Sequence, residues 1–360
     1  MRHINSLLIA ICITICAVSC KDNKPDYKKK LDVKTASVTD LAFSRYEDVL
    51  FNLDTADFQA ELMRIQSDYL PFLEGDLTNP NAVQYLKDFA TDEYTKILYQ
   101  KVKTAFPNLD FVKKTVEDVY AHFNYYYPEI QLPKKVFTCV SGVNSETPAV
   151  MVSDDNLIIS LDWYLNRDEV YDQIGMPRYM SERTVKETLA KDVALQLYMA
   201  YIYEWRKQTN LSDEMVIAGK IKYFIEAMTP ELPDNILLGY SEEQMKWAEE
   251  NEGEVWADIV GNQRLFSTGL DMHMTFLADG PFTQEYSNEA PARLGEFFGL
   301  HIVRSYMANN EVTPQQLMKN NDLQGIFQSS NYKPRKNRFF LVCEKKSPLT
   351  TMSEVIFILL

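Results

Sequence analysis

The sequence predicts an α+β fold, mostly helical, with a small sheet of about three strands embedded among the helices. Two observations lead to this prediction. Apolar residues recur at helical spacing before residue 127 and again after residue 181. Between these regions, residues 132–161 hold short β-branched runs separated by turn residues.

The region 39–126 is predicted to be helical. A first helix presents one apolar face, formed by Phe58, Leu62, Ile65 and Tyr69. Thr55 is its predicted N-cap. Two further amphipathic helices are expected over 85–106 and 110–127, and the prolines that directly follow, Pro107 and Pro128, end them.

Three strands are predicted over 136–140, 149–152 and 157–161. Turn residues separate them, and the adjacent acids Asp154 and Asp155 are interpreted as turn formers rather than as a catalytic pair. Cys139 lies inside an apolar run, which is typical of a buried thiol and not of a nucleophile.

Helices return after the sheet. The longest is predicted over 181–208, a second follows Ser212, a third opens with the capping box Ser241–Gln244, and a fourth starts near Pro291. The sequence shows no internal repeat. Residues 39–336 are predicted to form a single domain.

The N-terminus has the three parts of a lipoprotein signal peptide over 1–19. Arg2 is followed by an apolar run over 7–18, and small Ser19 precedes Cys20 at the cleavage point. The run of 12 residues is too short to cross a bilayer. We therefore expect cleavage between Ser19 and Cys20, and acylation of Cys20, so that lipid attaches the mature chain to a membrane.

The composition excludes several partners. The chain has a formal net charge of −14, which becomes −15 without the signal peptide. Nucleic acids and anionic membrane surfaces attract basic proteins, so neither is expected to bind directly. Residues 20–38 are rich in lysine and poor in apolar residues, and they are predicted to form a disordered tether.

Several segments together resemble one family, the gliding-motility lipoprotein GldB family of Bacteroidota. They are 43–47, 126–128, 159–165, 218–224, 238–240, 332–334 and, most specifically, the motif Pro291–Met307. The resemblance implies a palmitoylated lipoprotein of the cell envelope, located at the outer membrane, that works with the gliding motility and type IX secretion machinery.

The order of elements also resembles a zincin metallopeptidase, in which one helix carries H-E-x-x-H and a downstream glutamate completes the zinc site. In the best-matching stretch, Lys191 and Leu195 stand at the histidine positions and Asp192 at the general-base position. Ala218 stands where the glutamate belongs. The open alternative is that these helices form an ordinary core. Both interpretations predict no metal, no cofactor and no catalysis here.

Other sites are excluded or weakly indicated. His3 lies in the signal peptide, and His122, His273 and His301 lack ligand spacing. The sequence has no G-x-G-x-x-G, P-loop or G-x-S-x-G motif.

Four residues of the last motif, Arg293, Gly295, Gly299 and Arg304, are expected to serve helix packing and ion pairing or to face a cleft. Residues 337–360 form an apolar tail without a counterpart in the family, which we interpret as atypical.

These observations favour a non-catalytic accessory lipoprotein that acts by contact with other envelope proteins of the motility and secretion machinery. Two alternatives are a metal-dependent hydrolase of the zincin type and an envelope lipoprotein that binds nutrients. Bound metal would favour the first alternative, and an exposed shelf of aromatic side chains the second.

Overall fold

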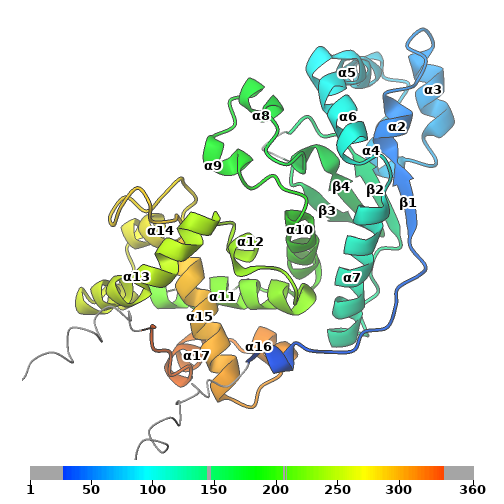
Figure 1. Ribbon diagram of the computed structural model, residues 1–360. Helices are drawn as coiled ribbons and strands as arrows, with labels where there is room; N and C mark the ends of the chain where they lie inside the picture. The colour runs from blue at the N-terminus through cyan, green and yellow to red at the C-terminus, as the bar shows by residue number, and fades with distance from the viewer. Residues whose placement is uncertain (1–26, 144–146, 206, 208, 336–360) are drawn as a thin grey trace, which may run out of the picture.

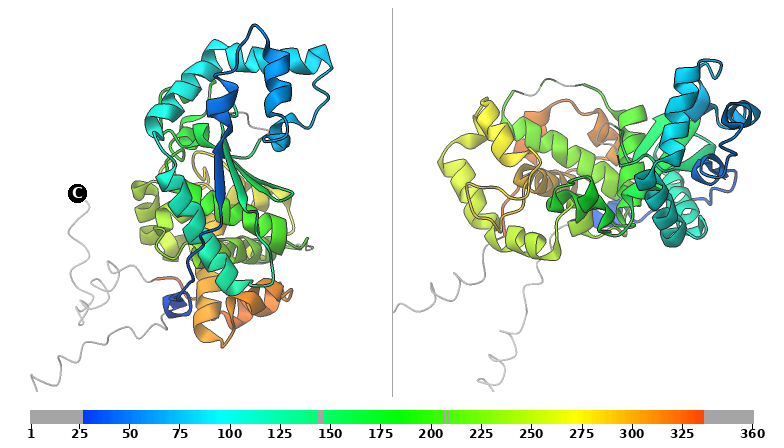
Figure 2. Two further views of the ribbon diagram at one scale, coloured as in Figure 1. Left: turned by 90° about the vertical axis from the view of Figure 1, so that its right-hand side faces the viewer. Right: turned by 90° about the horizontal axis from the view of Figure 1, so that it is seen from above.

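The computed structural model describes residues 27–143, 147–205, 207 and 209–335 (Figure 1). The predicted signal peptide, Cys20 and the apolar tail lie outside these residues. The sheet and the helices α2 to α7 occupy one end of the molecule, and α11 to α17 occupy the other (Figure 2). The fold is α+β, mostly helical with a small sheet.

The sheet has four strands in the order β1-β2-β4-β3. Three of them are parallel: β1 (Ala42–Arg45), β2 (Lys135–Cys139) and β4 (Asn156–Ser160). The last, β3 (Val150–Ser153), pairs antiparallel with β4. β2, β3 and β4 match the three predicted strands to within one or two residues.

β1 corrects the prediction that 39–126 is helical throughout. It has only four residues, and it pairs with a strand more than ninety positions away, with Phe43 opposite Val136. So short a segment carries almost no periodic signal of its own. Tertiary pairing with β2 makes it a strand.

Each face of the sheet has its own core. Phe137 and Ile158 face α2 (Tyr46–Leu50), α3 (Phe58–Ile65), α4 (Leu70–Leu73) and α5 (Pro80–Thr91). On the opposite face, Val136, Leu157 and Ile159 belong to the main core, which also includes α6 (Glu93–Ala105) and α7 (Asp110–Tyr126). This alternation follows from the period of two in a strand.

Two helix boundaries differ from the predicted ones. α3 begins after Asp57 rather than Thr55 and ends before Tyr69, although Tyr69 still packs against the same core. The helix predicted over 85–106 is two helices, because Asp92 ends α5 and its side chain accepts a hydrogen bond from the Thr95 amide at the start of α6.

The long helix predicted over 181–208 is also wrong in extent. Here α9 (Arg178–Ser181), α10 (Thr188–Leu197) and the π-helical turn η3 (Tyr198–Ile202) follow one another. The helix does not start at 181 because Thr184 accepts a hydrogen bond from the Asn166 amide, outside any helix. The loop that contains Asn166 follows η2 (Leu161–Trp163) and leads to α8 (Val170–Gln173).

The other end of the molecule is built on α11 (Leu211–Met228) and α15 (Leu294–Asn309), which cross in close contact. α13 (Glu242–Gly261) opens with the predicted capping box, formed by Ser241 and Gln244. The remaining short elements are α12 (Asp234–Leu238), η4 (Arg264–Phe266), α14 (Leu270–Phe276), α16 (Pro314–Lys319) and α17 (Leu323–Ser329).

The described part of the predicted tether is packed on the domain. η1 (Tyr27–Lys30) lies beside α15 (Figure 2), and the Arg304 guanidinium lies 4.9 Å from the centre of the Tyr27 ring. Lys30 Nζ donates to the carbonyls of Met307 and Asn310 at 2.6 and 2.7 Å, and Leu31 is buried. Residues 27–38 are therefore not a free tether, because a few apolar and basic side chains find partners on α15.

Candidate functional site

The candidate site is a cavity of about 320 Å³ between the edge of the sheet and α10, which we call the α10 cleft. Ala149 and Val150 of the β3 edge, Trp163, Arg183, Lys191 and Asp279 are among the residues that line it. Larger hollows, of about 860 and 720 Å³, lie near the start of β1 and beside α6. The α10 cleft is the candidate because it adjoins a network of partly buried charges.

The structure brings together three of the four residues that were compared with a zincin site. Lys191, Asp192 and Leu195 lie on α10, and all three line the cleft. Lys191 Nζ is 3.7 Å from an Asp192 carboxylate oxygen, and the Tyr164 hydroxyl donates to Asp192 at 2.9 Å. Asp192 thus has fixed partners at the position expected for a general base.

Ala218, the fourth position, lies on α11 and is not among the residues that line the cleft. One turn later on the same helix, Lys222 forms an ion pair of 2.9 Å with Glu296 of α15. Burial lowers the pKa of the Lys222 ammonium, although Glu296 opposes this effect. The Lys222 side chain is 12% exposed, so a mostly buried cation lies near Lys191 and Arg293.

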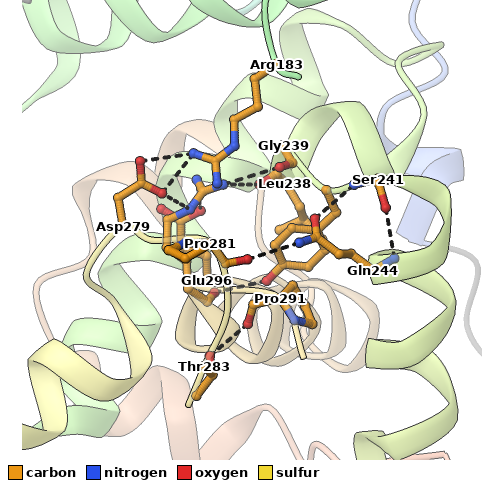
Figure 3. A network of polar contacts seen from close by, with 12 residues as sticks. Arg183, Leu238, Gly239, Ser241, Gln244, Asp279, Pro281, Thr283, Pro291 and Glu296 are labelled. Carbon is orange, nitrogen blue, oxygen red and sulfur yellow. Dashed lines mark hydrogen bonds and ion pairs between the residues drawn. The ribbon is translucent and has the colours of Figure 1, made fainter. Parts of the chain in front are cut away.

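Glu296 and Asp279 connect this cation to the cleft, and both acidic residues are labelled in Figure 3. Glu296 also accepts a hydrogen bond from Arg293 at 3.1 Å, and Arg293 Nε lies 3.3 Å from Asp279. Asp279 in turn accepts two hydrogen bonds from Arg183, at 2.8 and 3.0 Å. Burial opposes ionisation of Asp279, but the hydrogen bond and charge of Arg183 hold the pKa of its carboxyl below the usual value.

The loop 277–293 is held over this network by hydrogen bonds to its neighbours (Figure 3). Arg293 has a left-handed backbone conformation, with φ of 58°, and its Nη2 donates to the Leu238 carbonyl at 2.9 Å. The Gln244 side-chain amide donates a hydrogen bond to the Pro281 carbonyl at 3.3 Å. The Thr283 hydroxyl donates to the Pro291 carbonyl at 2.7 Å. The wall of the cleft that carries Asp279 is thereby fixed.

The two glycines of the last motif lie at close contacts between helices. A Cβ on Gly299 would stand 1.9 Å from the Met215 carbonyl oxygen of α11. A Cβ on Gly295 would stand 2.8 Å from both the Phe276 carbonyl oxygen and the Leu277 side chain. The structure therefore places both residues in packing rather than in the cleft.

Arg304 lies about three turns beyond Arg293 along α15 and does not face the cleft. It donates two hydrogen bonds to Glu226, at 2.7 and 3.0 Å, and two to Asp234, at 2.6 and 2.7 Å. Of the two arginines expected to pair or to face a cleft, Arg293 borders the network of the cleft and Arg304 forms a separate buried ion cluster.

The residues of the cleft do not fit a zinc ion. Lys191 is cationic, and neither Leu195 nor Ala218 has a ligating atom. Among the described residues, no three His, Cys, Asp or Glu side chains gather in a way that could hold a metal. His301 instead pairs with Glu252 at 3.1 Å, and His273 pairs with Glu214 at 3.2 Å.

Sequence reasoning missed most of the network. Glu296 lies inside the motif Pro291–Met307, and Lys222 interrupts an apolar helix. The sequence therefore contained a recognisable indication of both residues. Arg183 and Asp279 had none, because they lie 96 positions apart in irregular segments. Their pairing exists only in the folded chain.

Known proteins were compared with the whole chain. The model of a family described as gliding motility protein GldB matches residues 26–334. No curated protein and no solved structure matches the chain. None of the helices in the described residues is both long and apolar enough to cross a membrane. The match spans nearly all of the described structure, and the chain therefore belongs to the GldB family of gliding motility proteins.

Proposed function

We propose that this protein is a non-catalytic accessory lipoprotein, attached by lipid on Cys20 to the outer membrane, that acts by contact with other envelope proteins of the gliding motility and type IX secretion machinery. The family match supports a part in gliding motility. The family model carries the lipoprotein designation in its name, which supports an envelope location.

The observation that carries the non-catalytic part of the proposal is the Lys191–Asp192 pair. A zinc hydrolase needs three ligands and a free carboxylate to activate water. Here the Lys191 ammonium occupies the first ligand position, and the Asp192 carboxylate accepts a hydrogen bond from the Tyr164 hydroxyl. The remaining two positions hold the aliphatic residues Leu195 and Ala218.

Complementation of a gene deletion tests this proposal. Cell spreading and protein secretion should be lost in the deletion strain and restored by both the natural protein and Asp192→Asn. Cys20→Ser should fail to restore them and should not incorporate labelled palmitate. Stoichiometric zinc in the purified protein, or loss of function in a folded Asp192→Asn variant, would overturn the non-catalytic assignment.

Capture from native membranes tests the contact role. Crosslinking in cells followed by purification should recover envelope proteins of the motility or secretion machinery. Recovery of no envelope protein would count against the role as an accessory protein.

A further inference from the structure

We propose that the free edge of β3 and the α10 cleft together bind an extended segment of a partner protein. The segment would add to the sheet beside β3 and place an acidic side chain against Lys191. This inference rests on the proposed contact function and specifies the surface and the chemistry of the contact.

The first observation is the position of β3. It is the terminal strand of the sheet, and within the described residues its only strand partner is β4. The Ala149 carbonyl accepts a hydrogen bond from the Ser160 amide at 2.8 Å, and Val150 is opposite Ile159. Because such bonds alternate along an antiparallel pair, the backbone groups of Val150 and Val152 point away from β4. Val150 is 1% exposed, so the groups open to an added strand are those of the partly exposed Val152. An added strand pairs with groups of this kind.

The second observation is the charge of the cleft. Its lining and the network behind it contain four cationic side chains, Arg183, Lys191, Lys222 and Arg293. They contain three carboxylates, those of Asp192, Asp279 and Glu296. One positive charge is therefore in excess, within a chain whose net charge is −14. A ligand with one negative charge would complete the balance.

The third observation is that two donors beside the cleft have no hydrogen-bond acceptor among the described residues. Asp192 and Asp279 already accept hydrogen bonds, from Tyr164 and Arg183. Lys191 Nζ, in contrast, lies 3.7 Å from Asp192, beyond hydrogen-bond distance, and its side chain is 17% exposed. Trp163 also lines the cleft, and its indole N–H is buried without an acceptor. Both residues could donate to a carboxylate.

The geometry favours an acidic side chain over a chain terminus. An added strand runs along the whole edge, and alternate side chains then enter the pockets beside it. A terminal carboxylate in the cleft would end the strand there and leave the rest of the edge unpaired. The cavity of about 320 Å³ lies at the small end of ligand sites, which suits one or two side chains of a longer segment.

Two pools of blocked pentapeptides test the proposal. Each peptide is acetylated and amidated and has random flanking residues around a central Glu in one pool and a central Gln in the other. The immobilised protein should enrich the Glu pool about tenfold over the Gln pool, the effect of one charge-assisted hydrogen bond. The enriched peptides should shift the NMR resonance of the Trp163 indole N–H. This resonance is assigned by its absence from the spectrum of Trp163→Phe.

Two variants separate the parts of the site. Lys191→Met should abolish the preference for Glu, whereas Lys246→Met, which removes an exposed ammonium 3.9 Å from Glu250, should leave it unchanged. Val152→Pro removes an outward amide from an edge strand, where proline is tolerated, and should weaken binding of both pools. Thermal unfolding verifies that each variant is folded.

The outcomes are distinct. Equal retention of the two pools, an unmoved Trp163 resonance, or stronger binding of a pentapeptide with a free C-terminus and no acid would each overturn the inference. If crosslinking in cells recovers the same envelope proteins from Lys191→Met as from the natural protein, the contact function stands and this surface is wrong. If it recovers none from either, the contact function itself fails.

Discussion

Gly219 of α11 lies directly against Gly299 of α15. A Cβ built on Gly219 would stand 2.0 Å from the Gly299 carbonyl oxygen, and a Cβ on Gly299 would stand 3.0 Å from the Gly219 amide nitrogen. The two helix backbones therefore touch, with no side chain between them. This contact fixes Lys222 and Glu296, each three residues away on its own helix, at the distance of an ion pair.

Gly299→Ala should destabilise the fold by about 1–3 kcal/mol, because the new methyl group overlaps backbone atoms of α11 that no rotamer change can move. The free energy of urea unfolding measures this effect. Gly261→Ala is the matched control, since it lies in α13 with nothing within 4 Å of the added Cβ and should be neutral or slightly stabilising. Equal stabilities of the two variants would show that α11 and α15 can separate without loss.

Glu296→Gln should destabilise the protein more than Lys222→Met does. Glu296 is the shared partner of Lys222 and Arg293, at 2.9 and 3.1 Å. Its neutralisation leaves Lys222 without a counter-charge and Arg293 with Asp279 alone, at 3.3 Å. Removal of one partner from a fully buried pair costs about 3–5 kcal/mol, and the loss here should be smaller because the two side chains are 12% and 19% exposed. Lys222→Met leaves Glu296 paired with Arg293 and should cost less. Chemical unfolding of both single variants and of the double variant measures the coupling, and the reverse order of stabilities would refute this assignment.

As the pH rises from 4 to 6, the free energy of unfolding should decrease because of Asp162. Its side chain is fully buried and accepts hydrogen bonds from the Ser141 and Val143 amides at about 3.0 Å. Burial raises the pKa of this carboxyl to about 6, although those hydrogen bonds oppose the shift. The ordinary value in an unfolded chain is about 3.9.

Because the folded state holds this proton more tightly than the unfolded chain, Asp162 contributes stability at low pH that is lost as the pH rises through 6. The contribution is about 3 kcal/mol over the two pH units. Asp162→Asn should remove this part of the slope in urea unfolding measured at pH 4, 5 and 6.5. An unchanged slope in the variant would mean that the carboxyl titrates normally.

Leu31→Ala should loosen the N-terminal segment 27–41 without unfolding the domain. Leu31 is 3% exposed, and it holds η1 on α15 together with the hydrogen bonds of Lys30. Hydrogen exchange of residues 27–41 should become faster, because the segment loses its one fully buried apolar side chain. Lys34→Ala, at an exposed position of the same segment, serves as the control and should leave the exchange unchanged.

The sequence allowed the α+β class, three of the four strands and the capping box of α13 to be predicted. These features depend on local patterns, namely β-branched runs, turn residues and the pair Ser241 and Gln244. β1 and the end of α5 at Asp92 could not be predicted in this way. The first depends on a distant partner strand, and the second on a single side chain that caps the next helix.

For the site, the sequence indicated α10 and the motif Pro291–Met307, and the structure places Lys191 and Arg293 on two sides of one charge network. The network itself was not predictable. Arg183, Asp279 and Lys222 come from three separate segments, and no spacing within any one of them shows that they meet.

By itself, the sequence determined the class of the fold, the absence of a complete zinc-ligand set at 191–218 and the family, because each depends on residue identity and local order. Only the tertiary structure decided that α11 and α15 touch at two glycines and that β3 is left as a free edge beside a cleft with excess positive charge. The physical reason is that contacts and net charge at a site are sums over residues distant in the chain, which only folding brings together.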